Sequence, residues 1–338
     1  MSVTIEQLHN IDDIHSLISS YNGLLVIQAF ADANIIRFNA KLKQASTQPL
    51  LYAIGDLLPT YAAKHGIPDL QVKLIAIQDD TVANTEMLAG NIDVNYGGIG
   101  TYAYIWDKDP EKAKVISGVQ TLENWLVCTN PDIKTIKDIK PEHKIALKGI
   151  NGGDHIVLRE YAMAAFGPKE SERFNQNLVA MPRDAILATM QTEKPTIDCA
   201  IIGSPGQNIL TKDGKARIIA KPDNKVSFGY PTALYATTKW LNDNPNLAKA
   251  LYEATVEAMR LYKEDPERIV QRYIDIDGVT NTNAKEVVDM KRENRDIYNT
   301  SLVPGFATIQ IMIDAGVLKG PNKTIGKEAI YNPAWVKH

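Results

Sequence analysis

The chain has few of the residues and segments that mark several functional classes. Its 338 residues include only two cysteines, which cannot form a zinc site by themselves. Its six histidines are scattered, without the paired spacing of metal ligands. The longest apolar runs, such as residues 24–27, span only a few residues and exclude a membrane-crossing helix. These features predict a protein without a metal, cofactor or membrane span.

The charge is equally unremarkable. The net charge is −3 and no strongly basic stretch is present, which argues against a nucleic-acid partner. A hydrophobic content of 44% over this length is sufficient to fill two domain cores.

Cys128 and Cys199 both lie in apolar runs that are typical of strands, residues 125–129 and 197–202. One interpretation is two buried small hydrophobic residues. The other is a disulfide, which requires that the two strands be neighbours and that the compartment be oxidising.

The first 33 residues differ from the rest. An apolar stretch followed by Ala-Asp-Ala has the order of a secretion signal, but no Lys or Arg precedes Gly23 and the segment carries Glu6, Asp12 and Asp13. The alternative is a folded helix–strand extension. In either case, residues 1–33 look appended to a main body that begins near Asn34.

From residue 35 onward, strand and helix patterns alternate with short turns. Pro59 is expected to kink or divide the helix at residues 49–65. The alternation predicts mainly parallel α/β sheets covered on both faces, followed by helices after residue 237. Strands are expected at residues 35–40, 71–77, 92–95, 115–119, 144–147, 178–181, 197–202, 216–220 and 232–237.

Four strand-type runs end in a short segment of small or polar residues before a helix. These segments are residues 46–49, 96–101, 151–154 and 203–205. A helix N-terminus presents unpaired N–H groups and a partial positive charge, which favour an oxyanion. No nucleophile, base or metal cluster stands out beside them, so the pattern indicates capture of a small molecule rather than its conversion.

Several segments, in order, resemble the substrate-binding proteins of nitrate/sulfonate/taurine-type ABC importers. The resemblance covers roughly residues 34–316 and rests on the order and spacing of these segments. They are residues 50–55, residues 87–94 with their Leu-Ala-Gly-Asn-Ile-Asp step, residues 105–108, residues 129–147, residues 198–205 with their Ser-Pro junction, and residues 234–245.

The resemblance implies a bilobed periplasmic-binding-protein type II fold, with two α/β lobes, a hinge and the extra N-terminal segment. Lobe one is expected at residues 34–125 plus 230–338 and lobe two at residues 126–229. The two hinge crossings are expected near residues 124–129 and 225–230, with the ligand between the lobes.

In this architecture ligands bind where strands end and helices begin. Asp154 is expected to cap its helix or to bind an amine, Arg183 to supply a fixed cation, and Trp125 and Tyr230 to form aromatic walls. The candidate ligand-binding residues are Ser46, Thr47, Gln48, Gly98, Gly100, Thr101, Trp125, Asn151, Gly152, Gly153, Asp154, Arg183, Ser204 and Tyr230.

The expected function is therefore that of a binding protein, not an enzyme. It would capture a small anion, such as a sulfonate or nitrate, and present it as a monomer to an ABC permease from the periplasm or cell exterior. The alternative is an enzyme similar to the thiamine-pyrimidine synthases, which share this fold. Those enzymes carry a Lys and a His where this chain has Gly97 and Thr101, and a cysteine-rich stretch that this chain lacks.

Overall fold

The computed structural model describes most of the chain from Ile35 onward. The expected N-terminal segment, residues 1–33, and the candidate residues Ser46 and Thr47 lie outside the described part. The described residues are 35–39, 48–77, 79–204, 206–212, 214–223, 225, 227–277, 283–293, 297–332 and 334–335.

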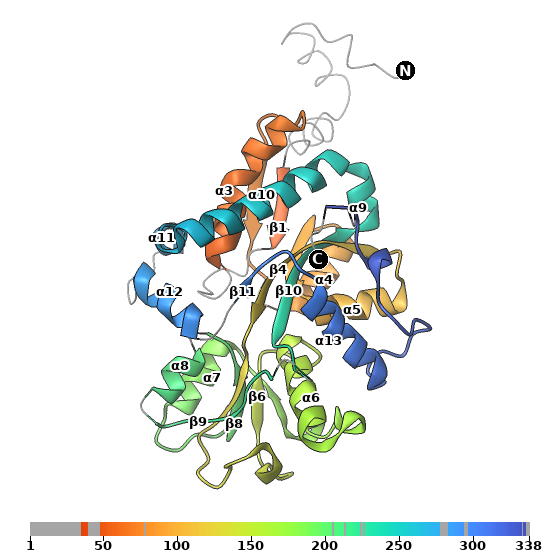
Figure 1. The fold of residues 1–338 in the computed structure, drawn as a ribbon. Coiled ribbons are helices and arrows are strands. Elements are labelled where there is room, and N and C mark those ends of the chain that lie inside the picture. The colour runs from red at the N-terminus through yellow and green to blue at the C-terminus, as the bar shows by residue number, and fades with distance from the viewer. Residues whose placement is uncertain are drawn as a thin grey trace, which may run out of the picture.

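The strands form two separate sheets, one in each half of the molecule (Figure 1). The first sheet has the order β11-β4-β10-β3-β1-β2 and the second the order β7-β6-β8-β5-β9. The first comprises β1 (Ile35–Asn39), β2 (Gln71–Ile75), β3 (Val94–Gly98), β4 (Ala113–Leu122), β10 (Tyr230–Thr237) and β11 (Ile297–Tyr298). The second comprises β5 (Trp125–Cys128), β6 (Ile145–Leu147), β7 (Leu178–Ala180), β8 (Cys199–Ile202) and β9 (Arg217–Ala220).

The expectation of mainly parallel sheets holds only in part. β1 pairs in parallel with β2 and β3, and β6 with β7 and β8, but the other pairs are antiparallel. Every antiparallel pair includes β4, β5 or β10. β5 and β10 are the first strands after the chain passes from one sheet to the other, and they run against the strands beside them. β4 follows β3 and α5 and keeps the direction of β3, since both are antiparallel to β10.

The chain leaves the first sheet at the end of β4 and enters the second at β5, through Glu123 and Asn124. It returns from β9 to β10 through residues 221–229. The first half is therefore built from two separated stretches of chain, whereas the second is continuous.

Helices pack around both sheets. In the first half α10 lies along α3, and α13 lies against α5 (Figure 1). The α-helices are α3 (Gln48–Lys64), α4 (Asp80–Ala89), α5 (Ile99–Lys108), α6 (Gly153–Phe166), α7 (Arg183–Met190), α8 (Gly206–Thr211), α9 (Thr238–Asp243), α10 (Pro245–Glu264), α11 (Pro266–Asp277), α12 (Ala284–Glu293) and α13 (Val303–Asp314). In the described part of the chain, the short 3-10 helices are η2 (Ile136–Asp138), η3 (Pro168–Glu170), η4 (Asn175–Asn177) and η5 (Lys327–Ala329).

Pro59 does not divide α3, which runs unbroken from Gln48 to Lys64. A proline ring inside a helix crowds the residue four positions earlier. That residue is Gly55, and its backbone carbonyl is the group that the ring crowds. Burial of Leu50, Leu51 and Leu58 against the first sheet favours the continuous helix despite this crowding.

Each face of the second sheet has its own apolar core. Along β5, Leu126 and Cys128 belong to one core cluster, and Trp125 and Val127 belong to the other. This alternation is the two-residue period of a strand buried on both sides.

Cys128 and Cys199 occupy paired positions on β5 and β8 and form a disulfide. Their Cα atoms are 4.0 Å apart and both side chains are buried. Of the two interpretations of these cysteines, the structure supports the disulfide.

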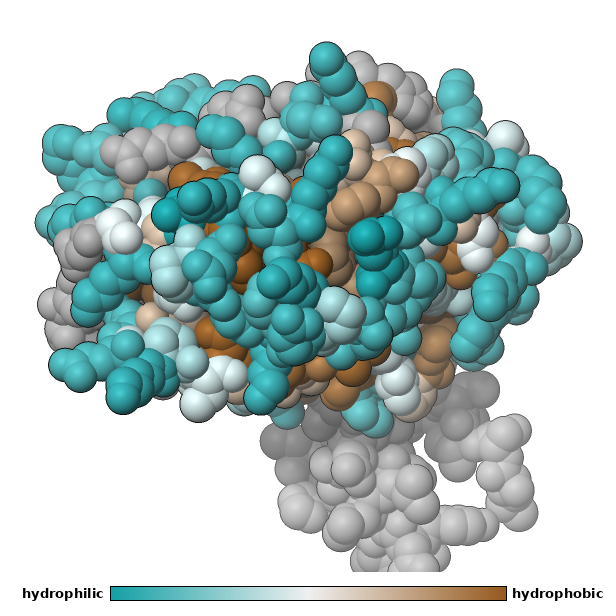
Figure 2. Space-filling model, turned by 90° about the horizontal axis from the view of Figure 1, so that it is seen from below, coloured by the Kyte–Doolittle hydropathy of each residue, from teal (hydrophilic) through white to brown (hydrophobic). Residues whose placement is uncertain are grey.

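Figure 2 views the molecule from the end that the second half forms. Hydrophilic side chains cover most of this face, and hydrophobic ones show in separate patches between them. Within the described residues, no helix has both the length and the apolar character needed to cross a membrane.

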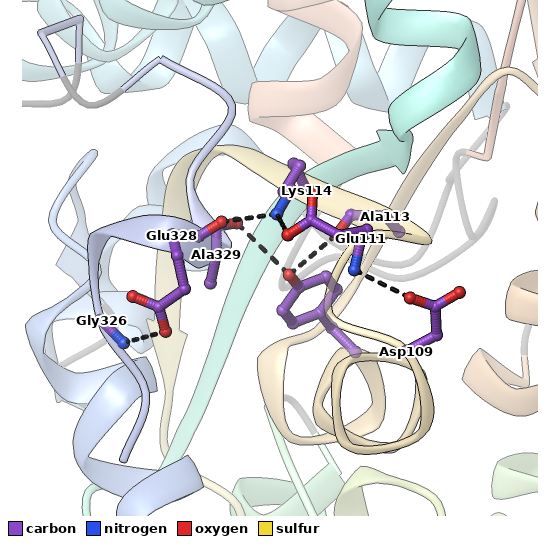
Figure 3. A network of polar contacts seen from close by, with 8 residues as sticks. Asp109, Glu111, Ala113, Lys114, Gly326, Glu328 and Ala329 are labelled. Carbon is purple, nitrogen blue, oxygen red and sulfur yellow. Dashed lines mark hydrogen bonds and ion pairs between the residues drawn. The ribbon is translucent and has the colours of Figure 1, made fainter. Parts of the chain in front are cut away.

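The C-terminal segment is tied to the start of β4 (Figure 3). The ammonium group of Lys114 donates to the Glu111 carboxylate at 2.9 Å and to the backbone oxygen of Glu328 at 2.8 Å. The backbone N–H of Tyr331 donates to the Val115 carbonyl at 2.9 Å. These bonds complete the first half with residues from the end of the chain.

Candidate functional site

Two of the expected strand-to-helix junctions face each other across the gap between the halves. Gly98 ends β3 and caps α5, while Gly152 caps α6 in the other half. The ring of Tyr230 lies between them: a Cβ atom on Gly98 would be 2.3 Å from Tyr230 Cε2, and one on Gly153 would be 1.9 Å from it. Both positions therefore require glycine for the halves to come this close.

The hydroxyl of Tyr230 donates to Asp80 Oδ2, and the backbone N–H of Gly98 donates to the same oxygen at 3.3 Å. Burial, and next the negative charge of Asp154, raise the pKa of Tyr230 well above its usual value. Tyr230 is thus a neutral hydrogen-bond donor at physiological pH.

A small cavity of ≈ 20 Å³ remains beside Tyr230. Acidic side chains dominate its lining: Asp79, Asp80 and Asp154 against the single base Lys148. Asp154 does not cap α6 as expected, because Gly152 holds that position. Its carboxylate instead accepts from Asn124 Nδ2 at 2.8 Å and from the Lys148 backbone N–H at 3.3 Å, which turns it toward the crossing between the halves.

The turn before α6 is held by His155. Asn151 adopts a left-handed conformation with φ of 64°, and its N–H donates to His155 Nδ1 at 3.0 Å. The ring proton is then on Nε2, which faces Asn175 Oδ1 at 3.0 Å. Burial, and next the positive charge of Arg159, lower the pKa of His155 to about 4, so the ring is neutral at physiological pH.

A larger cavity of ≈ 920 Å³ has walls from both halves. Thr101 and Asn151, two of the expected site residues, line it. Arg159 of α6 reaches across to α5, where its Nη1 donates to the Tyr104 hydroxyl at 2.8 Å. Burial raises the pKa of Tyr104, so this hydroxyl stays protonated while it accepts from the guanidinium.

A buried amide network supports the first-half side of the site. Asn95 Nδ2 donates to Asn84 Oδ1 and to the Tyr235 hydroxyl, both at 2.9 Å. Asn84 in turn donates to the Thr101 carbonyl at 3.1 Å, which fixes α4 relative to α5. Thr101 itself donates to the Gly98 carbonyl at 2.7 Å and so stabilises the first turn of α5.

Other expected residues lie away from these cavities. Trp125 is buried in a core cluster of the second half, with its Nε1 donating to Glu123 at 3.1 Å. Arg183 donates to the backbone oxygens of Gly203, at 2.7 Å, and Ser204. Gly100 packs against Ile156 of α6, and Gln48 begins α3.

Sequence reasoning missed Asp79, Asp80, Tyr104, Lys148 and Arg159. One usable signal was the Asp79-Asp80 pair at the start of α4: Asp79 caps the helix by accepting from the N–H groups of Thr81 and Val82. Nothing in the sequence marked Arg159, which lies inside a helix. Among the described residues, no group of three or more His, Cys, Asp or Glu side chains could hold a metal ion.

Comparison with solved structures shows the periplasmic-binding-protein fold. The alkanesulfonate-binding protein SsuA from Xanthomonas axonopodis matches with a TM-score of 0.65 and 14% identity over 88% of this chain and 98% of that one. The aliphatic sulphonate-binding protein SsuA from Escherichia coli matches with a TM-score of 0.63 and 15% identity over 89% and 99%. The nitrate-binding protein NrtA from Synechocystis gives 0.58 and 16% over 86% and 83%. The expected bilobed α/β fold class is confirmed.

Comparison with curated protein sequences gives no match. A family model, however, matches residues 52–275, about two thirds of the chain; it describes the substrate-binding domain of an ABC-type glycine betaine transport system. The expected resemblance to substrate-binding proteins of ABC importers is thereby confirmed. The chain belongs to this family of substrate-binding domains of ABC-type transport systems.

Proposed function

We propose that this substrate-binding protein captures a small anionic ligand between its two halves and presents it to an ABC permease. The observation that carries the proposal is the ≈ 920 Å³ cavity, whose walls come from α4 and α5 of one half and α6 of the other. A ligand held by both halves favours their approach, because it binds the closed arrangement better than the open one.

We propose further that the halves are the two lobes expected from the sequence, residues 34–125 plus 230–338 and residues 126–229. The two sheets support this division, as do the passages between them at residues 123–124 and 221–229. A monomer suffices, since a single chain supplies both walls of the cavity.

An anion is supported by the neighbours that bind alkanesulfonate and nitrate, and by the basic residues of the larger cavity. The N-terminus of α6 is less suitable than expected. Asp79, Asp80 and Asp154 surround it, and their charge opposes that of an oxyanion. The proposed place for the anion is therefore the larger cavity.

Binding without conversion is supported by the state of the titratable groups near α6. Both ring nitrogens of His155 and the carboxylate of Asp154 are engaged in hydrogen bonds that hold the turn. The two cysteines do not form the cysteine-rich stretch of the synthase-like alternative; they form a buried disulfide. Such a disulfide also supports a periplasmic or extracellular location, because these compartments are oxidising.

The test is a thermal-shift screen with nitrate, bicarbonate, taurine and methanesulfonate, followed by small-angle scattering with each binder. A ligand at a hundredfold its Kd should add about 2.7 kcal/mol of stability and reduce the radius of gyration. Chromatography should then recover the ligand unchanged. A ligand-derived product that disappears in the His155→Ala variant would contradict the proposal.

A further inference from the structure

The charge on the walls of the ≈ 920 Å³ cavity points to the chemistry of its occupant. The cavity is within the size range of small-molecule sites. Its lining includes four basic residues and only two acidic ones, Asp109 and Glu172. The basic residues are Lys108, Lys112, Arg159 and Lys319. Within the described part of the chain, no carboxylate forms an ion pair with any of the three lysines.

Arg159 is the buried cation of this cavity, with an exposed fraction of 7%. Its Nη1 donates to the Tyr104 hydroxyl at 2.8 Å and its Nη2 to Asn151 Oδ1 at 3.1 Å. Its Nε–H, by contrast, has no partner among the described residues. A buried N–H without an acceptor is unfavourable by about 1–3 kcal/mol. An acceptor on a ligand would remove this penalty.

A carboxylate of the chain already lies against this guanidinium. Glu172 Oε1 is 2.8 Å from Arg159 Nη2, and the Glu172 side chain is 50% exposed. Solvent reaches the Glu172 side of this pair and weakens it there. Glu172 therefore shows that a carboxylate fits against Arg159, although its other oxygen accepts from Asn175 Nδ2. A carboxylate from solution can take its place at the guanidinium.

Apolar side chains line one part of the cavity, beside uncharged polar residues such as Thr81, Thr85 and Ser171. Leu88 comes from α4, Ile105 from α5, and Val317 from the turn after α13. Together with the ring of Tyr104 they offer a surface for a short hydrocarbon chain.

We propose that this cavity is a binding site for a small organic carboxylate, with Arg159 as its fixed cation and Leu88, Ile105 and Val317 around the apolar part. The proposal rests on the proposed function, because the ligand would bridge α5 of one half and α6 of the other.

The test is isothermal titration calorimetry with hexanoate, and with hexylamine as a probe of equal length and opposite charge. Wild-type protein should bind hexanoate and not hexylamine. Glu172→Gln removes the competing carboxylate and should tighten hexanoate binding by roughly threefold to tenfold. Arg159→Met should weaken it by at least about tenfold.

Glu170→Gln is the matched control. Glu170 lies two residues from Glu172 and pairs with Arg173 at 3.1 Å, but it does not line the cavity. Its variant should bind hexanoate like the wild type. Loss of the buried Arg159 could disturb α6. The comparison of Glu172→Gln with Glu170→Gln therefore tests the site without changing Arg159.

No saturable binding of hexanoate, equal affinity in both glutamine variants, or preference for hexylamine would overturn the proposal. The proposed function fails differently. If hexanoate binds as described but the radius of gyration does not fall, the carboxylate site is correct and capture between the halves is not. If the halves close around another ligand and Glu172→Gln does not change its affinity, the capture function is correct and the carboxylate site is not.

Discussion

At the scale of single residues, contact between the two halves depends on the ring of Tyr230. The ring lies against Gly98 of the first half and Gly153 of the second, and its hydroxyl donates to Asp80. The space that the ring fills exists because two glycines on different elements both lack a side chain.

Substitution Gly153→Ala should therefore separate the halves. The new methyl group would be 1.9 Å from Tyr230 Cε2, and relieving such overpacking costs about 1–3 kcal/mol. Urea unfolding should show lower stability and small-angle scattering a larger radius of gyration. Alanine favours the helix itself, so the added Tyr230→Ala change should reverse the increase in size. An unchanged radius in the single variant would contradict this account.

His155 should make the stability depend on pH on the acid side. Its pKa falls from 6.5 to about 4 on folding, chiefly through burial. As the pH drops from 6.5 toward 4, the unfolded chain takes up the proton first and the folded protein loses stability, by at most roughly 3 kcal/mol. Urea unfolding at pH 4 and pH 7 should show a smaller difference for His155→Gln than for the wild type. An equal difference in both proteins would assign the effect to other groups.

The sequence pointed to Gly98, Gly153 and Tyr230, which the structure brings together. It could not separate Arg183 from Arg159. Arg183 opens a helix, where a ligand cation is expected, but its guanidinium bonds to backbone oxygens of the turn after β8. Arg159 lies two turns into α6, and only the packing of α6 against α5 places it at a cavity. That packing is a long-range property that local patterns do not encode.

At the scale of elements, hydrophobic periodicity predicted where strands and helices lie in the sequence better than it predicted which strands pair with each other. The strand β5 was expected from its apolar run, but the run does not reveal which strands lie beside it. Only the register with β8, which pairs Cys128 with Cys199, distinguishes a disulfide from two buried thiols.

The double variant Cys128→Ala/Cys199→Ala should be less stable than the oxidised protein by about 2–4 kcal/mol, because the disulfide closes a long loop in the unfolded chain. The cysteines are 71 positions apart in the sequence. Urea unfolding with and without reductant measures the difference. Reductant should destabilise the wild type and leave the double variant unchanged. Two free thiols in the denatured, unreduced protein would contradict the disulfide.

At the scale of the whole molecule, the two-sheet α/β fold followed from the alternating pattern and from the order of the family-like segments. Strand directions did not. β5 and β10 run against their neighbours because each is the first strand after the chain passes from one sheet to the other. The residues of a single segment do not indicate that the chain passes to another sheet at that point, so they do not predict the strand direction.

Glu160 links the second half to the returning passage and should act on global stability. It is 1% exposed, and Ser227 of the passage donates to its carboxylate at 2.8 Å. Burial raises its pKa from 4.5 to about 8, an effect that the Ser227 hydrogen bond partly offsets. Between these values the unfolded chain ionises while the folded protein retains the proton, so stability falls with rising pH, by up to roughly 5 kcal/mol at pH 8.

Glu160→Gln keeps an acceptor for Ser227 and removes the ionisation. It should flatten the decline in unfolding free energy between pH 5 and pH 8 and should be more stable than the wild type at pH 8. Urea titrations at both pH values measure this. A variant that loses stability with pH as steeply as the wild type would show that Glu160 does not control the slope.

β10 lies between β4 and β3 in the first sheet, yet it follows the whole second half in the chain. While the protein is being synthesised, every strand of the second sheet leaves the ribosome before β10 does. The second half therefore has its complete set of strands while β3 still lacks one neighbour and β4 lacks both, β10 and β11. Unpaired edges of this kind are open to pairing with other chains. The first half is therefore synthesised first but completes its folding last. Its strands β3 and β4 are the part of the nascent chain that most needs protection.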